Sequence, residues 1–415
     1  MRIERLGDLG SAPQVLRTLT GAATRLGLAP PAALIGDWFG ARAVIAPSVT
    51  AAPVAPSEVF DVVPGNRRDG PVGGGWFGYL SYPDAGADGL GPRIPEAAGG
   101  WSDSVLRCDR QGRWWYESLS GAAVSDWVTD ALRTAAPLRA AVVEWGDADR
   151  EAHRRGVIAC LDAIAAGEVY QACVCTQFTG RIHGEAVDYF AEAVERTAPS
   201  RAAFLAGGWG AIASLSPELF VRRCGEDVTS SPIKGTLPRD EDPDTLRASV
   251  KDVAENIMIV DLVRNDLGRV ARTGSVAVPE LLAIRPAPGV WHLVSTVSAQ
   301  VSADLPMATL LEATFPPASV TGTPKLRARE LLRGWEPRRR GIYCGTVGLA
   351  SPAAGCELNV AIRTVEFSAD GTAVLGVGGG ITADSDPGRE WDECLHKAAP
   401  IVGADAYSRA RRTAS

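Results

Sequence analysis

The pattern of apolar and polar residues divides the chain into two regions. Up to about residue 140, short apolar pieces such as 32–35 and 44–45 alternate with stretches rich in Gly and Pro, such as 64–75. This pattern predicts short strands and loops with a few helices. From about residue 150 the apolar positions recur with clearer periods. We therefore expect an N-terminal lobe over residues 1–140 and a catalytic region over 145–405.

The periodic apolar positions of the second region predict its helices and strands. Helices are expected at 150–166, 185–196, 244–268 and 388–398. In the long helix, Asp244 is a plausible N-cap, and the positions expected to face the core are 246, 250, 253, 257 and 260. Strands are expected at 114–119, 169–174, 203–213, 218–223, 290–301, 342–350, 357–366 and 373–378. Because helices and strands do not alternate regularly, an α+β fold is favoured over a parallel βαβ sheet.

Composition and charge narrow the classes of function. The 415 residues are 46% hydrophobic and 22% charged, with a formal net charge of -7. Acidic and basic residues are interspersed, so neither nucleic-acid binding nor membrane binding is expected. No stretch approaches the roughly 20 apolar residues that span a bilayer, and the N-terminus has no signal-like apolar run, which predicts a cytoplasmic protein. The eight cysteines show no C-x-x-C spacing, so buried free thiols are expected.

Two pairs of carboxylates are the first candidates for chemistry. Asp252 and Glu255 share one helical face, and Glu390 and Glu393 repeat the spacing on a second helix, with Lys397 one turn further on. Such pairs are ordinarily solvated surfaces, but two of them on separate helices could also close around Mg²⁺. Gly378, Gly379 and Gly380 precede the second pair, and a glycine run lets backbone N–H groups approach an anionic ligand.

A lysine between a proline and a glycine is the second candidate. Lys234 lies in the sequence Pro-Ile-Lys-Gly-Thr, where an exposed turn lysine is the ordinary interpretation. A nucleophilic lysine would have to be neutral, and Gly235 and Thr236 could donate hydrogen bonds to a carboxylate. His292 could simply be a satisfied core histidine, whereas Arg363, within an expected strand, requires an anionic partner. Tyr343 is a further polar candidate.

Nine segments in the same order resemble the chorismate-utilising enzymes, a family that includes anthranilate, aminodeoxychorismate, isochorismate and salicylate synthases. They are GEVYQ (167–171), SPELF (216–220), PIKGT (232–236), KDVAENIMIVDLVRNDLGRV (251–270), HLVS (292–295), FPPASVTGTPK (315–325), RGIYCGTVG (340–348), NVAIRT (359–364) and GGGITADSDPGREWDEC (378–394). The resemblance covers about residues 150–400. It implies two mainly antiparallel β-sheets packed as a sandwich with helices around them.

The resemblance also implies a role for each matching residue. Chorismate would be the substrate and Mg²⁺ the cofactor, held by Glu255 and Glu393, with Asp252 and Glu390 reaching it through water. The implied catalytic residues are Lys234, Glu218, His292, Asp252 and Glu390. The implied substrate-binding residues are Gln171, Gly235, Thr236, Tyr343, Arg363, Gly378, Gly379, Gly380 and Lys397.

Two positions divide the family by reaction. Isochorismate and salicylate synthases carry a water-activating lysine where this chain has Gln171, so amination is favoured over hydroxylation. Anthranilate synthases carry alanine where this chain has Lys234, whereas in aminodeoxychorismate synthases a lysine there attacks C2 of chorismate. The resemblance thus implies amination of chorismate at C4 for 4-aminobenzoate and folate synthesis.

The family obtains its ammonia from a glutamine amidotransferase, which we expect to be a separate subunit. Anthranilate synthase component I is the alternative enzyme. A non-catalytic amino-acid sensor that keeps the fold is a more distant alternative, but it would not need the four carboxylates.

Overall fold

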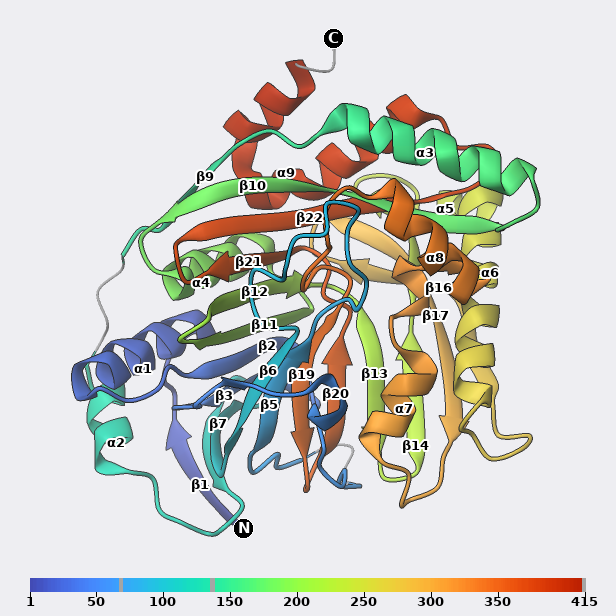
Figure 1. Ribbon diagram of the computed structural model, residues 1–415. Coiled ribbons are helices and arrows are strands. Elements are labelled where there is room, and N and C mark those ends of the chain that lie inside the picture. Colours follow the sequence, from blue (N-terminus) through green and yellow to red (C-terminus); the bar gives the residue numbers. More distant parts are fainter. Residues whose placement is uncertain (67–69, 135–138, 413–415) are drawn as a thin grey trace.

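The computed structural model describes residues 1–66, 70–134 and 139–412. Within these residues the strands form two large sheets, and neighbouring strands in both run antiparallel. Figure 1 shows the sheets together with the helices that lie around them. The predicted α+β class, with two antiparallel sheets packed as a sandwich, is confirmed.

The larger sheet holds residues from both ends of the chain. Its strands, in spatial order, are β1 (Arg2–Gly7), β8 (Trp114–Ser118), β7 (Ser104–Cys108), β3 (Ala41–Ala46), β2 (Ala32–Trp38), β11 (Arg201–Gly207), β12 (Gly210–Ser216), β21 (Thr364–Ser368), β22 (Thr372–Ile381), β10 (Gln171–His183) and β18 (Gly322–Thr323). In addition, β9 (Val142–Trp145) pairs with the far end of β10.

The second sheet also combines both regions. Its strands, in spatial order, are β15 (Ile233–Pro238), β17 (Val290–Gln300), β14 (Asp227–Ser231), β13 (Leu219–Cys224), β20 (Gly355–Asn359), β19 (Thr346–Ser351), β5 (Gly75–Leu80), β6 (Ala97–Ser102) and β4 (Ala52–Pro53). The long strand β16 (Ala277–Ala287) also pairs with β17.

Apolar side chains from both sheets meet in the sandwich core. Leu34 and Leu205 of the larger sheet are buried in one cluster with Phe77 and Leu349 of the second sheet. Because β2 pairs with β11 and β5 pairs with β19, the N-terminal lobe completes both sheets. The boundary at residues 140–145 therefore lies between segments of chain that share sheets, and it stays a prediction.

Helices cover the outer faces of the sandwich (Figure 1). They are α1 (Ala12–Leu26), α2 (Asp126–Leu132), α3 (Arg150–Ala165), α4 (Ala186–Thr197), α5 (Asp244–Ala248), α6 (Val250–Gly268), α7 (Met307–Thr314), α8 (Lys325–Trp335) and α9 (Pro387–Arg412), with short 3₁₀ turns η1 (Pro56–Glu58) and η2 (Ala318–Val320). Side chains of α1, α4 and α9 join the outer core of the larger sheet, and those of α6 and α7 join the second sheet.

The long helix expected at 244–268 is divided at Ser249. The Ser249 side chain accepts a hydrogen bond from the Asp252 backbone N–H at 3.2 Å and so caps α6. The predicted core stripe is confirmed at Leu246 and Val260, which are 2% and 5% exposed, but it is wrong at Val250 and Ile257, which are 85% and 46% exposed. The buried face carries Glu255 and Asn256 instead, followed by apolar residues of the later turns.

Other boundaries also differ from the expectation. The strand expected at 203–213 is the hairpin of β11 and β12, and the strand expected at 357–366 is divided between β20 and β21. The helix expected at 388–398 is the first part of α9, which Gly403 interrupts with a non-helical backbone. All eight cysteines are buried and unoxidised, as predicted. Among the described residues, none of the helices is both long and apolar enough to cross a membrane.

Candidate active site

Lys234 lies in a β-bulge on the edge strand β15. The pairing of β15 with β17 shifts register between Ile233 and Thr236, so Lys234 belongs to a strand rather than to the expected turn. Gly235 has φ +88°, and a Cβ added to it would lie 3.2 Å from the Asp252 Cβ. A glycine is therefore required here, both for the backbone conformation and for the close approach of α6.

The two predicted pairs of carboxylates face one another across the end of β22. Asp252 and Glu255 lie on the first turns of α6, and Glu390 and Glu393 lie on the first turns of α9. A Cβ added to Gly379 would lie 3.1 Å from Glu390 Oε2 and 3.5 Å from Glu393 Oε1. The glycine run thus allows the second pair to lie directly on the strand. We call these four carboxylates the acidic site.

Three lysines lie among these carboxylates. Lys234 Nζ is 4.0 Å from Glu255 Oε2, and Lys251 Nζ is 3.9 Å from the other oxygen of Glu255. Lys397 Nζ is 2.7 Å from Glu393 Oε1 and donates a hydrogen bond to the Gly378 carbonyl at 2.8 Å. Burial raises the pKa of Glu255, although both neighbouring lysines oppose this shift.

The described residues include no group of three or more His, Cys, Asp or Glu side chains already arranged around one metal position. Nevertheless, the donor set fits a hard cation. Glu390 Oε1 accepts a hydrogen bond from Ser385 Oγ at 2.6 Å, whereas its buried Oε2 has no partner in the described part of the chain. A buried carboxylate oxygen without a partner is costly, and carboxylate oxygens are the ligands that Mg²⁺ prefers.

Gln171 and Gly380 form the wall opposite α6. A Cβ added to Gly380 would lie 3.2 Å from Gln171 Oε1 and 3.3 Å from Lys234 Nζ. Gln171 is 2% exposed, and its Oε1 has no hydrogen-bond donor among the described residues. The bare backbone of Gly380 therefore leaves room between the amide and the amine for part of a ligand.

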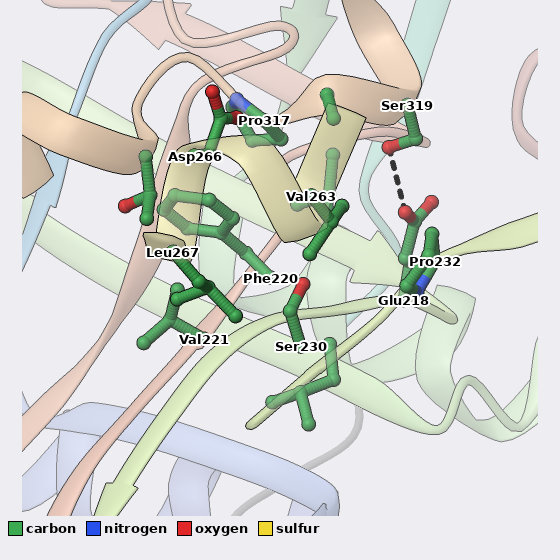
Figure 2. A pocket seen from close by; sticks show the side chains of 14 residues that line it. Glu218, Phe220, Val221, Ser230, Pro232, Val263, Asp266, Leu267, Pro317 and Ser319 are labelled. Carbon is green, nitrogen blue, oxygen red and sulfur yellow. Dashed lines mark hydrogen bonds between the residues drawn. The ribbon is translucent and has the colours of Figure 1, made fainter. Parts of the chain in front are cut away.

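Glu218 is a buried acid close to Lys234. Its Oε1 accepts a hydrogen bond from Ser319 Oγ at 2.6 Å. Burial raises the pKa of Glu218 to about 7, although Ser319 and Lys234 lower it. Figure 2 shows this pair at one side of a pocket, with Asp266 and Pro317 at the other. Near neutral pH, Glu218 can both give and accept a proton.

His292 lies on β17, next to Thr236 of β15. Its Nδ1 is 3.0 Å from Thr236 Oγ1, and its buried Nε2 has no partner within the described chain. Burial, followed by the charge of Arg363, lowers the pKa of His292 to about 4. The imidazole is therefore neutral at physiological pH, with one nitrogen free for a ligand.

Tyr343 and Arg363 lie outside the strands. Arg363 precedes β21 with φ +51° rather than lying within a strand as expected, and burial lowers the pKa of its guanidinium. No hydrogen bond or ion pair of its side chain is found among the described residues, which agrees with a binding role for an anion. The Tyr343 hydroxyl is 4.0 Å from Cys175 Sγ, and burial raises its pKa.

The structure thus brings the predicted residues to one region of the fold, and it adds residues that motif reasoning missed. Ser319 is identified as part of the site by its hydrogen bond to Glu218, and Lys251 by its contacts with two carboxylates. The position of Lys251, one helical turn before Glu255, was the available sequence signal. Ser319 had no such signal, because Ser319 in η2 and its partner Glu218, directly before β13, are distant in sequence.

The matching sequence profile and the similar proteins agree on one family. The sequence profile of the chorismate binding enzymes matches residues 41–403. Aminodeoxychorismate synthase component 1 of Escherichia coli (strain K12) is 34% identical over 382 residues, which cover 82% of this chain and 79% of that protein. The protein of the same name from Klebsiella aerogenes is 42% identical over 243 residues, 57% of this chain and 54% of its own length. In that alignment the chain spans about half of its relative.

Solved structures show the same fold. Anthranilate synthase component I from Streptococcus pneumoniae TIGR4 superposes with a TM-score of 0.73 at 24% sequence identity, covering 90% of this chain and 91% of that chain. At this identity the likeness supports the arrangement of the sheets and helices alone.

Proposed function

Because the chain belongs to the chorismate binding enzyme family, we propose that it is the chorismate-aminating component of an aminodeoxychorismate synthase. The observation that carries the proposal is the environment of Lys234. This amine lies beside Gln171, the bare backbone of Gly380 and a buried acid with a pKa of about 7. These neighbours support a role for Lys234 as a nucleophile with a proton donor nearby.

The proposed reaction has two displacement steps. The Lys234 amine attacks C2 of chorismate and gives up a proton, both ring double bonds shift, and the C4 hydroxyl leaves as water with a proton from an acid. Ammonia then attacks C4 and gives up a proton, both double bonds shift back, and the bond from C2 to Lys234 breaks as that nitrogen takes up a proton. The product, 4-amino-4-deoxychorismate, keeps its enolpyruvyl group. We assign it to 4-aminobenzoate and folate synthesis.

The residues around the ring divide the remaining work. Glu218 has the pKa of a proton donor to the departing hydroxyl, and neutral His292 presents a free nitrogen in the same region. Arg363 and Tyr343 would hold the pyruvyl carboxylate, because a guanidinium and a phenol both donate hydrogen bonds. Gln171 is an amide and cannot activate water, which leaves ammonia as the nucleophile.

Mg²⁺ fits the acidic site in this proposal. Glu255 and Glu393 would hold it, with Asp252 and Glu390 reaching it through water, and Gly235, Thr236 and Gly380 would contact the ring carboxylate. When bound, the ion would neutralise that carboxylate and favour loss of the C4 hydroxyl. A separate glutamine amidotransferase would supply ammonia, and ammonium salts would replace it at high concentration.

Product identification tests the proposal. The purified chain is incubated with chorismate, Mg²⁺ and ammonium, and the product is analysed by mass and by its response to added aminodeoxychorismate lyase. We expect a compound that the lyase converts to 4-aminobenzoate. Fluorescent anthranilate formed without the lyase would instead identify an anthranilate synthase, and the absence of any ammonium-dependent product would indicate a sensor. A reaction without ammonium is the control.

A further inference from the structure

The protein uses lysine at very few positions. Only four of its 42 basic residues are lysines, namely Lys234, Lys251, Lys325 and Lys397, and the others are arginines. Three of the four lie among the carboxylates of the acidic site, and Lys325 is buried against Asp266. A lysine carries a compact point charge that fits between carboxylates, whereas arginine is a planar fork. In this chain, lysine therefore occurs where an ammonium contacts carboxylates. The proposed reaction gives Lys251 no role.

Lys251 connects the two helices that carry the acidic site. Its Nζ donates a hydrogen bond to Glu390 Oε1 on α9 at 3.3 Å and lies 3.9 Å from Glu255 Oε1 on α6. The Glu390 side chain is only 3% exposed, so this ion pair is sheltered at the carboxylate end. The Lys251 side chain itself is 46% exposed, so the ammonium can swing into solvent by rotating its flexible stem.

The position of this ammonium conflicts with a bound divalent ion. A cation held between α6 and α9 would use carboxylate oxygens that Lys251 now contacts. It would then lie within a few ångströms of a like charge, where repulsion is strong in a partly buried site. The partnerless Oε2 of Glu390 shows that one ammonium does not satisfy this carboxylate pair.

We propose that Lys251 is a resident cation of the acidic site. It holds α6 and α9 together before Mg²⁺ arrives, and it leaves its place when Mg²⁺ binds. Lys251 is a positioning residue, because it acts through Glu255 and Glu390. The inference rests on the proposed Mg²⁺ site and adds a means by which Glu255 and Glu390, on separate helices, stay close together without the metal.

Calorimetric titration of Mg²⁺ into Lys251→Met tests the competition. Methionine keeps the length of the side chain and removes its charge, so we expect Mg²⁺ to bind about tenfold more tightly than to the wild type. The melting temperature in EDTA should fall, while the increase on adding Mg²⁺ should grow. Lys251→Arg keeps the charge and should not gain affinity. An unchanged or weaker affinity of Lys251→Met would overturn the inference.

Amine labelling tests the same inference on the wild-type protein. Because the chain has only four lysines, reductive methylation followed by mass spectrometry reads each of them separately. We expect Mg²⁺ to increase the labelling of Lys251, with Lys325 as the internal control. Unchanged or reduced labelling of Lys251 at saturating Mg²⁺ would refute its displacement. If the wild type binds no Mg²⁺, the metal site and this inference both fail, whereas product identification alone decides the reaction.

Discussion

Lys234 Nζ lies 4.0 Å from Glu255 Oε2, so this amine could act as a nucleophile or only as a positive charge. Two substitutions separate these roles. Lys234→Ala removes both nucleophile and charge, whereas Lys234→Arg keeps the charge. We expect both variants to lose turnover of chorismate with ammonium by at least about a hundredfold, because a guanidinium does not replace an amine nucleophile. Turnover is measured through lyase-coupled formation of 4-aminobenzoate. If Lys234→Arg keeps wild-type turnover, the side chain acts through its charge alone.

The raised pKa of Glu218 predicts that both activity and stability depend on pH. Its pKa is raised to about 7 from a usual value of 4.5. As a proton donor, Glu218 should support turnover less well as the pH rises through 7. The folded state also binds this proton more tightly than the unfolded state does. The resulting stabilisation is fully present below pH 4.5 and is lost as the pH rises through 7, a change of about 3 kcal/mol.

Glu218→Gln provides the matched variant for this prediction. Glutamine keeps the shape and cannot ionise, so the difference in unfolding free energy between wild type and variant should change between pH 5 and 8, as measured by urea unfolding. Turnover should fall at every pH. A difference that stays constant over this range would exclude Glu218 as the titrating group.

The sequence predicted the place of a residue where the residue lies in a long motif. Glu255, Glu393 and Lys234 lie in long motifs, and the structure brings them together as the resemblance implies. Arg363 was placed in a strand because Ile362 and Thr364 flank it in an apolar run, but its backbone turns at φ +51°. A local pattern does not contain that turn, which depends on how β20 and β21 enter different sheets.

At the scale of elements, α6 shows where periodicity fails. Apolar spacing placed Val250 and Ile257 in the core, yet both are exposed, because the first turns of α6 direct Glu255 and Asn256 to the buried face. The buried face includes Asn256, whose Nδ2 donates to the Leu293 carbonyl at 3.2 Å. A helix that serves a polar site buries polar residues, and an apolar stripe then identifies only part of the buried face.

The junction of α6, α7 and α8 depends on one buried ion pair. Lys325 Nζ donates to Asp266 Oδ2 at 2.5 Å and to the carbonyls of Thr314 and Pro316 at 2.9 and 2.8 Å. Lys325→Met would leave the Asp266 carboxylate buried without its counter-ion. We expect the free energy of unfolding to fall by about 3–5 kcal/mol, measured by urea denaturation.

The double variant Asp266→Asn with Lys325→Met is the control for this pair. Removing both charges should recover part of the loss, because the main cost is an unpaired buried charge. If the double variant is as unstable as the sum of the two single variants, the ion pair itself contributes little and packing around the Lys325 stem explains the loss.

At the scale of the whole molecule, the fold class was within reach of the sequence and the relation between the two regions was not. Irregular alternation of helices and strands indicated an α+β protein, and nine ordered motifs implied the sandwich. Pairing of β5 with β19 joins residues more than 250 positions apart, and no local signal specifies such a partner. The N-terminal lobe looked separate because its elements are short, yet it supplies strands to both sheets.

This shared architecture predicts that the catalytic region does not fold alone. A fragment of residues 141–412 would leave the edges of β11 and β19 without their partners β2 and β5, and would expose the sandwich core around Leu205 and Leu349. We expect it to aggregate or to melt without a cooperative transition in circular dichroism. Co-expression with residues 1–140 should restore a soluble complex with ammonium-dependent turnover, because the broken chain can still pair its strands. If the fragment alone melts cooperatively near the wild-type temperature, the two regions are independent domains.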